Sequence, residues 1–479
     1  MNPRPYRNPG FLISSAVVAL LLVLQLSEFT PGKAGADSMD TALKEMQTFV
    51  EAYRLVQADY ADTGKIDPNA LIQGAIRGML ETLGDPHSRY LPVQDAKDLM
   101  IETAGEFGGI GIHIGMENER LSVIAPGEGT PAWRGGVEAG DAIMTIDGRA
   151  TDTMSLDVAV TLLRGPVGTG VTIEVKRAGL EELIKIPLVR DVIQIHSVRF
   201  TQYEDLGYIR ISQFSERTAD ELDEAISALT KQNVRGLILD LRDNPGGVLT
   251  GATAVSNRFI DSGVIVSVVS RDPRQTTSYS ASPMAAATKL PVAVLVNGGS
   301  ASASEIVSGA IQDHHRGVVI GTKTYGKGSV QTVENLPDNS KIALTTARYF
   351  TPSGRSIHGV GLHPDTGMEI EIPILSDTEL KALKRLNDTD IVRDYARKKA
   401  DYTQADIDRL AILVKAADID IPRDLLERRY VAELARRNDN RMYLLPHLDR
   451  QLKKAIDVLH GASSLDEKEA ARPAVTARH

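Results

Sequence analysis

The sequence of 479 residues contains no cysteine, and this absence excludes disulfide bonds, thiolate-bound metals and cysteine nucleophiles. It also lacks an excess of positive charge. Its 54 lysines and arginines are outnumbered by 63 acidic residues, which gives a formal charge of −9 and argues against nucleic acid as a general partner. With 42% hydrophobic residues at this length, we expect a globular protein of two or three domains.

The N-terminal region has an apolar stretch, but a short one. The uncharged run from Phe11 to Leu26 has 16 residues, whereas a membrane span needs about 20. Arg4 and Arg7 precede this run, and Ala34-Gly35-Ala36 follows it with an A-x-A cleavage pattern. We therefore expect residues 1–36 to be a signal peptide, with a retained membrane anchor as the alternative, and the protein to reach the periplasm or cell envelope of a bacterium.

The stretch from Asn297 to Gln331 contains the most informative chemistry. An apolar run, Pro291 to Val296, predicts a buried strand, and Ile306 to Ile311 has helical spacing. Ser302 lies at the junction, where the first backbone N–H groups of a helix have no intrahelical partner. Those groups can stabilise an oxyanion, so the position suits a nucleophile.

Lys327 follows a second apolar strand, Val318 to Ile320, and lies between two glycines that let the backbone approach closely. Lysine normally titrates near ~10.4, but burial disfavours its charged form and makes a neutral amine available as a general base. A neighbouring carboxylate would have the opposite effect. The amide of Gln331 is therefore a suitable neighbour for a basic lysine, and a serine–lysine pair is a known alternative to the serine–histidine–aspartate triad.

Two other interpretations of these residues remain. Gly321 to Lys327 fits the start of a phosphate-binding loop, but Gly328 stands where that loop requires serine or threonine. Ser302 and Ser304 also fit helix caps, the usual role of serine at such a junction, and we expect this role for Ser304.

The serine and lysine motifs together resemble those of the C-terminal processing peptidases, also called tail-specific proteases. That family pairs a SASASE-like segment with a GKG-x-VQ segment, and the resemblance extends from about Glu81 to about Asp365. It implies that Ser302 is the nucleophile, Lys327 the general base and Gln331 the residue that orients the lysine. It also implies a peptidase core of the α/β fold shared with ClpP and crotonase-like proteins, within residues 191–375.

A loop before this stretch, Arg242 to Gly247, follows the apolar run Gly236–Leu241 and matches the family's DLR-x-N-x-GG segment. The resemblance implies an oxyanion hole made by a glycine N–H of this loop together with the N–H of Ala303. Gly247 is the first choice and Gly246 the second, and an ordinary strand-to-helix turn is the alternative. We expect Asp240, Arg242 and Asn244 to hold the loop in place.

Residues 105–190 resemble a PDZ domain, with alternating strands, Gly-Asp and Asp-Gly turns, and a helix from Ser155 to Leu163. In such a domain, a glycine-rich loop binds the carboxylate of a protein C-terminus, because successive N–H groups point into one concavity. A glycine-rich strand without a ligand is the alternative. The residues implied are Gly108, Gly109, Ile110, Gly111 and Ile112. We also hypothesise that Arg164, after the helix, couples this domain to the core; an exposed helix-capping arginine is the alternative.

Helical patterns surround these domains. We expect an N-terminal helical region at 37–104, a helical assembly or partner-binding region at 376–462 and a disordered tail at 463–479. The histidines lack metal-site spacing, so we expect structural or exposed roles and no metal. These histidines are His87, His314, His315, His358 and His363.

These features predict an α/β multidomain serine endopeptidase that recognises the C-terminal tails of protein substrates and needs no cofactor. We expect homo-oligomers formed through the terminal helical regions, and an adaptor or activator protein is a further candidate partner. Two alternatives belong to other classes. One is an inactive PDZ scaffold that binds protein C-termini, and the other is an acyl hydrolase built on a crotonase-like core.

Overall fold

The computed structural model describes residues 36–117, 119–272, 274, 276–285, 287–371, 373–437 and 442–470. The expected signal segment therefore lies outside the described residues, apart from Ala36. The chain divides into two compact units, Met1–Pro86 and His87–His479.

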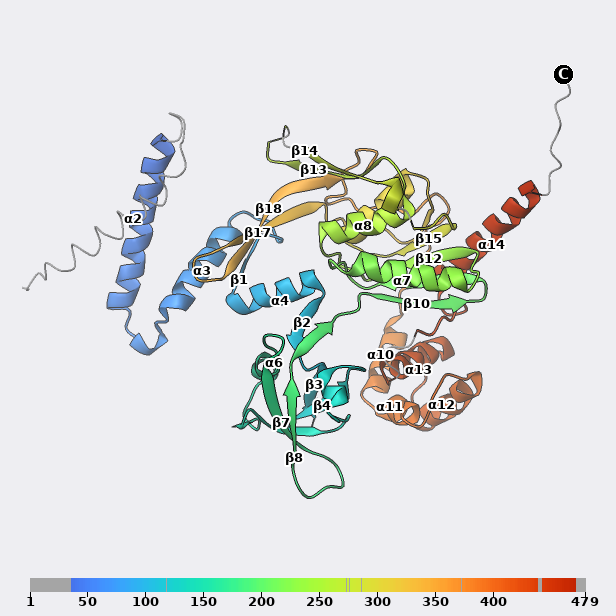
Figure 1. Cartoon of the computed structure of the whole chain (residues 1–479), viewed down its shortest axis with the longest axis horizontal. Coiled ribbons are helices and arrows are strands. Elements are labelled where there is room, and N and C mark those ends of the chain that lie inside the picture. Colours follow the sequence, from blue (N-terminus) through green and yellow to red (C-terminus); the bar gives the residue numbers. More distant parts are fainter. Residues whose placement is uncertain are drawn as a thin grey trace, which may run out of the picture. The chain divides into compact units, whose positions relative to one another are not determined.

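The first unit contains two helices, α2 (Ala36–Asp59) and α3 (Pro68–Glu81), joined through the short 3-10 helix η2 (Thr63–Lys65) (Figure 1). The Asp67 side chain accepts hydrogen bonds from the N–H groups of Asn69 and Ala70, which fixes the start of α3. Across the described residues, no helix is long and apolar enough to span a membrane.

The second unit begins with β1 (Arg89–Leu91), α4 (Val93–Ala104) and β2 (Glu106–Gly109). Residues 37–104, which we expected to form one helical region, thus include the strand β1, and this strand pairs with β18 of the later domain. A β-rich domain follows, with sheet order β3-β4-β5-β7-β8, and its core is a separate cluster around Ile146 and Ile173. The strands are β3 (Ile112–Glu117), β4 (Arg120–Pro126), β5 (Ala142–Ile146), β6 (Arg149–Ala150), β7 (Gly170–Lys176) and β8 (Ile184–Val189), and the helices are α5 (Pro131–Arg134) and α6 (Leu156–Leu163).

The largest domain is built on a sheet of order β10-β11-β12-β15-β16, in which only the β10–β11 pair is antiparallel. The apolar runs of β12 and β15 are buried on both faces, as expected for parallel strands covered by helices. The strands are β10 (Val198–Tyr203), β11 (Leu206–Ile211), β12 (Gly236–Asp240), β15 (Val292–Val296) and β16 (Val318–Gly321).

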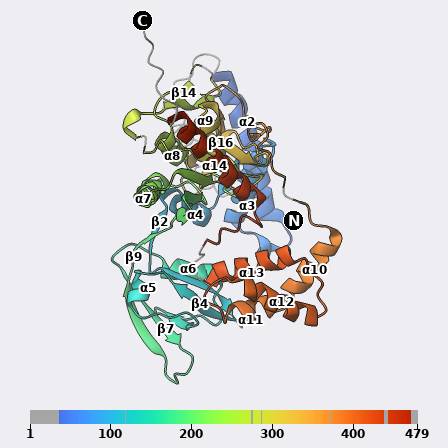
Figure 2. The same ribbon diagram turned by 90° about the vertical axis from the view of Figure 1, so that its right-hand side faces the viewer.

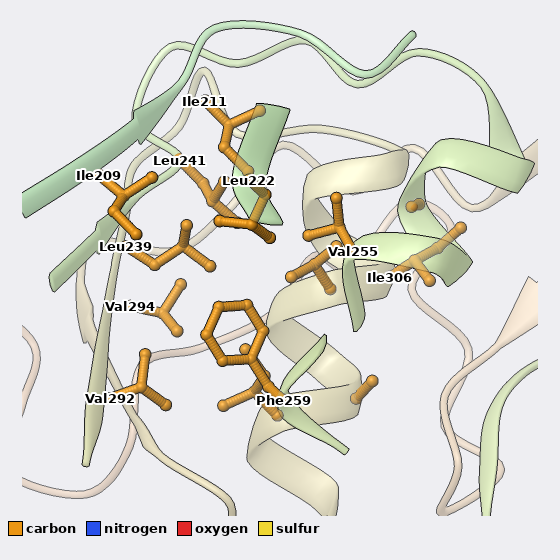
Figure 3. Packing of buried hydrophobic residues seen from close by; sticks show 14 of the residues in the cluster. Ile209, Ile211, Leu222, Leu239, Leu241, Val255, Phe259, Val292, Val294 and Ile306 are labelled. Carbon is orange, nitrogen blue, oxygen red and sulfur yellow. The ribbon is translucent and has the colours of Figure 1, made fainter. Parts of the chain in front are cut away.

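Helices cover both faces of this sheet. On one face α7 (Thr218–Lys231), α8 (Leu249–Phe259) and α9 (Ala303–Asp313) pack against alternate strand residues, as the labelled side chains of Figure 3 show. On the other face α14 (Arg450–Ala470) buries its apolar stripe. The C-terminal helix therefore completes the core of its own chain, and it continues as a helix to residue 470, into the stretch expected to be disordered.

A second sheet joins β1, β18, β13 and β14 in this order, and β17 also pairs with β18. The β17–β18 hairpin follows the lysine motif and returns the chain to α9, where Tyr349 contacts Ser302. The strands are β13 (Val264–Ser270), β14 (Thr276–Ser280), β17 (Ser329–Asn335) and β18 (Lys341–Phe350); β9 (Asp191–Gln194) pairs with β2, and the 3-10 helix η3 (Pro283–Ala285) follows β14.

The helices before α14 form a small cluster of their own around Tyr430. Figure 2 shows α11, α12 and α13 packed together. Their bounds are α10 (Asp377–Asn387), α11 (Ile391–Ala396), α12 (Gln404–Ala416) and α13 (Arg423–Arg437).

Candidate active site

The carboxyl ends of the parallel strands β12 and β15 place two loops side by side, as open α/β sheets commonly do at their ligand sites. Asn244, in the loop after β12, joins them. Its carbonyl oxygen accepts the Ala301 N–H at 3.0 Å and the Ser304 hydroxyl at 2.9 Å. Its side-chain N–H donates to the Ile211 carbonyl at 2.9 Å, so the serine loop is fixed to the centre of the sheet.

Ser302 lies at the junction of the β15 loop and α9, with φ 55° and ψ −113°. A non-glycine residue in this region is strained, and the strain is maintained because hydrogen bonds fix the loop on both sides. The Ser302 side chain is half-buried, and its Oγ accepts a hydrogen bond from the Tyr349 hydroxyl at 2.6 Å. The predicted nucleophile is therefore held out of the sheet at the first turn of a helix.

Glu305 links the serine loop to the lysine loop. Its side chain is completely buried. One carboxylate oxygen accepts the Ser302 N–H at 2.9 Å and the Lys327 N–H at 2.8 Å, while the other accepts the Thr324 hydroxyl at 2.5 Å and the Gly326 N–H at 2.8 Å. Burial raises the pKa of Glu305 above its ordinary value, although these four donors oppose the shift.

Lys327 lies in the loop between β16 and β17 and is half-buried. The glycines on both sides have a structural reason. Gly326 has φ +95°, and a Cβ at Gly328 would lie 2.6 Å from the backbone nitrogen of His358. The two predicted dyad residues, 25 positions apart in sequence, thus share a single carboxylate through their backbone N–H groups.

Gln331 lies on β17, where its Nε2 donates to the Ser329 hydroxyl at 2.9 Å and to the Thr345 hydroxyl at 3.0 Å. The structure thus anchors this amide to the β17–β18 hairpin. Its predicted role in orienting Lys327 stays a prediction.

The three residues predicted for the oxyanion hole differ in their hydrogen bonds. The Gly246 N–H donates to Asn244 Oδ1 at 2.9 Å, so it is already engaged. Within the described parts of the chain, neither the Gly247 N–H nor the Ala303 N–H donates to a protein acceptor. A Cβ at Gly247 would lie 2.0 Å from the Phe214 carbonyl oxygen, so only glycine fits there. The geometry therefore favours Gly247 over Gly246 as the partner of Ala303.

A buried ionic network supports the loop that carries Gly247. Asp240 is completely buried and accepts the Tyr208 hydroxyl at 2.5 Å and the Arg242 guanidinium at 2.6 Å. Burial alone would raise the pKa of Asp240, but the charges of Arg242 and Arg210 hold it below its usual value. Arg242 also pairs with Asp449 at 2.7 Å, just before α14. The expectation that Asp240, Arg242 and Asn244 hold this loop is confirmed.

In the β-rich domain, the predicted carboxylate-binding segment is divided between two strands. Gly108 and Gly109 belong to β2, which pairs with β9, and Ile112 begins β3. Ile110 is buried, and Gly111 has φ +73° with its carbonyl oxygen accepting the Gly127 N–H at 2.8 Å. The glycine at 111 is required by this left-handed turn, because a Cβ there would lie 2.3 Å from Thr130.

Arg164 follows α6 and contacts α4. Its guanidinium forms an ion pair with Asp98 at 3.0 Å and lies 4.6 Å from the centre of the Phe107 ring. These contacts join the β-rich domain to the helix that precedes it, and the coupling of this domain to the core stays a prediction.

Among the histidines, His314 Nε2 lies 2.7 Å from the Val264 carbonyl oxygen, while His315 and His363 are exposed. In the described part of the chain, one group of side chains has the spacing to hold a metal ion, namely Glu204, Asp205 and His460. None of the histidines considered from the sequence belongs to it.

Comparison with known proteins identifies the families that this chain resembles. A family model described as Peptidase family S41 matches residues 205–368, a PDZ domain model matches 122–177, and a model described as the activating protease CtpB N-terminal domain matches 25–95. The carboxy-terminal-processing protease of Bartonella bacilliformis is 40% identical over 367 residues, which cover 76% of this chain and 83% of that protein. The carboxy-terminal processing protease CtpA of Bacillus subtilis is 35% identical over 364 residues, covering 75% and 76%.

Among solved structures, a photosystem II D1 C-terminal processing protease is 33% identical, covers 69% of this chain and 93% of its own, and has a TM-score of 0.39. The matched models together define a serine-type peptidase with a PDZ domain. The chain belongs to peptidase family S41, among the carboxy-terminal processing proteases.

Sequence reasoning missed two residues of the site. Glu305 had a usable signal, because a glutamate three residues after a serine at a helix start is the capping-box pattern. Tyr349 had none, since its distance from Ser302 depends on the return of β18 from the far end of a hairpin.

Proposed function

We propose that this protein is an exported endopeptidase that binds the free C-terminal tails of protein substrates and cleaves them with a Ser302–Lys327 dyad. The observation that carries the proposal is the buried Glu305 carboxylate, which accepts both backbone N–H groups of the dyad residues on one oxygen. A carboxylate in this position fixes the nucleophile loop and the lysine loop relative to each other, as bond-forming chemistry requires.

In the acylation step, the neutral amine of Lys327 takes the Ser302 hydroxyl proton while Oγ bonds to the substrate carbonyl carbon. The carbonyl oxygen becomes an oxyanion, which the Gly247 and Ala303 N–H groups stabilise. Lys327 then gives the proton to the leaving amine as the peptide C–N bond breaks. A water molecule hydrolyses the resulting ester by the same route and restores both residues.

The β-rich domain supplies a suitable place for the tail. β3 is an edge strand of its sheet, and α6 lies beside it. An extended peptide can therefore pair with β3, with its terminal carboxylate toward the segment from Gly108 to Ile112. Binding there would deliver a substrate to the core by its C-terminus.

Export and assembly complete the proposal. The export signal rests on the sequence before residue 37, and cell fractionation with N-terminal sequencing of the mature protein tests it. Assembly through the first unit is supported by exposed apolar side chains on α2 and α3, which light scattering of the purified chain tests. These side chains include Met46, Phe49, Val50, Ile72 and Met79.

The decisive experiment measures cleavage of a protein with an unstructured tail by wild type, Ser302→Ala and Lys327→Ala, with the tail's carboxylate free or amidated. Lys323→Ala, which changes an exposed lysine of the same loop, is the matched control. We expect activity in wild type and the control, none in the dyad variants and slower cleavage of the amidated tail. Cleavage that survives both dyad substitutions would exclude the mechanism.

A further inference from the structure

The hydroxyl of Tyr349 contacts the predicted nucleophile directly. Its oxygen lies 2.6 Å from Ser302 Oγ, with the tyrosine as donor. This is a short O–H···O hydrogen bond. Tyr349 lies near the end of β18, 47 residues after the serine. Its side chain is 3% exposed, so the phenol is largely shielded from water.

Tyr349 is held firmly on both sides of the site. Its backbone N–H donates to the Gly328 carbonyl oxygen at 3.0 Å, directly beside Lys327. Its ring belongs to the same hydrophobic cluster as Ala303 and Ile306, at the start of the serine helix. The hydroxyl is therefore fixed relative to both the serine and the lysine loop.

The direction of this hydrogen bond suits catalysis. A serine hydroxyl has one proton to donate and two lone pairs to accept with. When Tyr349 donates to one lone pair, the serine proton is left for the base, and the other lone pair is left for attack. Burial raises the pKa of the Tyr349 phenol, and the nearby Glu305 carboxylate adds to the shift, so the phenol remains a donor.

We propose that Tyr349 is a catalytic residue that orients Ser302 Oγ and stabilises the negative charge that develops there. The proposal rests on the proposed serine–lysine mechanism. As the proton moves from Ser302 to Lys327, the hydrogen bond from Tyr349 becomes charge-assisted and strengthens. Once Oγ has bonded to the carbonyl carbon it becomes a weak acceptor, so Tyr349 assists proton transfer and attack and not the binding of substrate.

The test compares Tyr349→Phe with wild type in two assays, turnover of a peptide substrate and the rate of covalent labelling of Ser302 by a fluorophosphonate. We expect kcat and the labelling rate to fall together by about 10- to 100-fold, the usual effect of removing a hydrogen bond to a charged group, while KM changes less than about twofold. Tyr279→Phe, at a partly buried tyrosine packed on the same core, is the matched control and should label at the wild-type rate.

Ser302→Ala separates failure of this inference from failure of the mechanism. Labelling that persists in Ser302→Ala would overturn the assignment of the nucleophile. Labelling lost in Ser302→Ala but normal in Tyr349→Phe would overturn only the role of Tyr349.

If the phenylalanine variant does not fold, ring-fluorinated tyrosines incorporated at position 349 decide the question. They keep the hydroxyl and the shape of the ring and form a series of increasing donor strength. We expect the labelling rate to rise along the series, because a stronger donor stabilises the charge that develops on Ser302 Oγ more. A rate that falls, or does not depend on donor strength, would overturn the proposal.

Discussion

The Glu305 carboxylate accepts the backbone N–H of Ser302 at 2.9 Å, and the same oxygen accepts the N–H of Lys327 at 2.8 Å. This shared acceptor explains how two loops from different strands keep a constant separation. A buried group with four donors is rigid, because losing any one bond leaves a donor unsatisfied in the interior.

Glu305→Gln should therefore damage both stability and activity. The amide keeps the shape but directs an NH₂ group at donors, so at least one of them loses its acceptor. We expect a loss of about 2–4 kcal/mol in the free energy of unfolding, and a fall in kcat of at least about tenfold. Urea unfolding and steady-state kinetics measure these. Glu334→Gln, at an exposed position on β17, should change neither, and a fully active Glu305→Gln would contradict the argument.

Gly247→Ala should remove one oxyanion donor. The added Cβ would lie 2.0 Å from the Phe214 carbonyl oxygen, so the loop must shift and carry the Gly247 N–H away from the site. We expect kcat to fall by about 10²–10³-fold with little change in KM. Gly179→Ala, at φ +83° with open space around it, is the control for backbone strain and should keep its activity. Normal kcat in Gly247→Ala would exclude this N–H from the oxyanion hole.

Asp240 should make the fold sensitive to acid. Its pKa is lowered in the folded state, so its ion pairs stabilise the fold at pH above the ordinary carboxyl value of 3.8. This contribution is lost as the pH falls through the lower folded value. The free energy of unfolding of Asp240→Asn should be about 3–5 kcal/mol lower at neutral pH, because Arg242 stays buried with a partner removed. In the acid range, the free energy of unfolding of this variant should depend less on pH than that of wild type. Urea unfolding across the acid range tests this, with the exposed Asp457→Asn as the control. An unchanged acid slope would contradict it.

Arg164→Ala tests the proposed coupling between the PDZ domain and the core. The ion pair with Asp98 is partly exposed and should contribute less than about 1 kcal/mol to stability. We expect cleavage to slow severalfold while the affinity of the isolated tail peptide changes less than about twofold. Asp98→Asn should have the same effect, since it removes the other partner. Arg134→Ala, which breaks an exposed ion pair between this domain and Asp191 of β9, is the control. Normal cleavage in Arg164→Ala would exclude coupling.

Local sequence patterns were enough to predict most of the secondary-structure elements and the motifs. Apolar runs such as Val292–Val296 predict buried strands, because apolar side chains on both faces of a strand must be covered on both sides. Gly328 was recognisable because a close backbone approach tolerates no side chain, and Ser302 because a helix start exposes N–H groups, whereas Gly247 followed from the family resemblance. The family followed from these local patterns.

Which side chains contact one another became clear from the folded structure alone. The apolar stripe of α14 begins in the region expected to serve assembly or partner binding, but it packs with Ile238 and Leu295 of the chain's own sheet. Tyr349 reaches Ser302 through the register of the β17–β18 hairpin, and Glu305 collects donors from a loop 21 residues away. Contacts of this kind depend on strand order and register, which are set by the whole core and not by any local pattern.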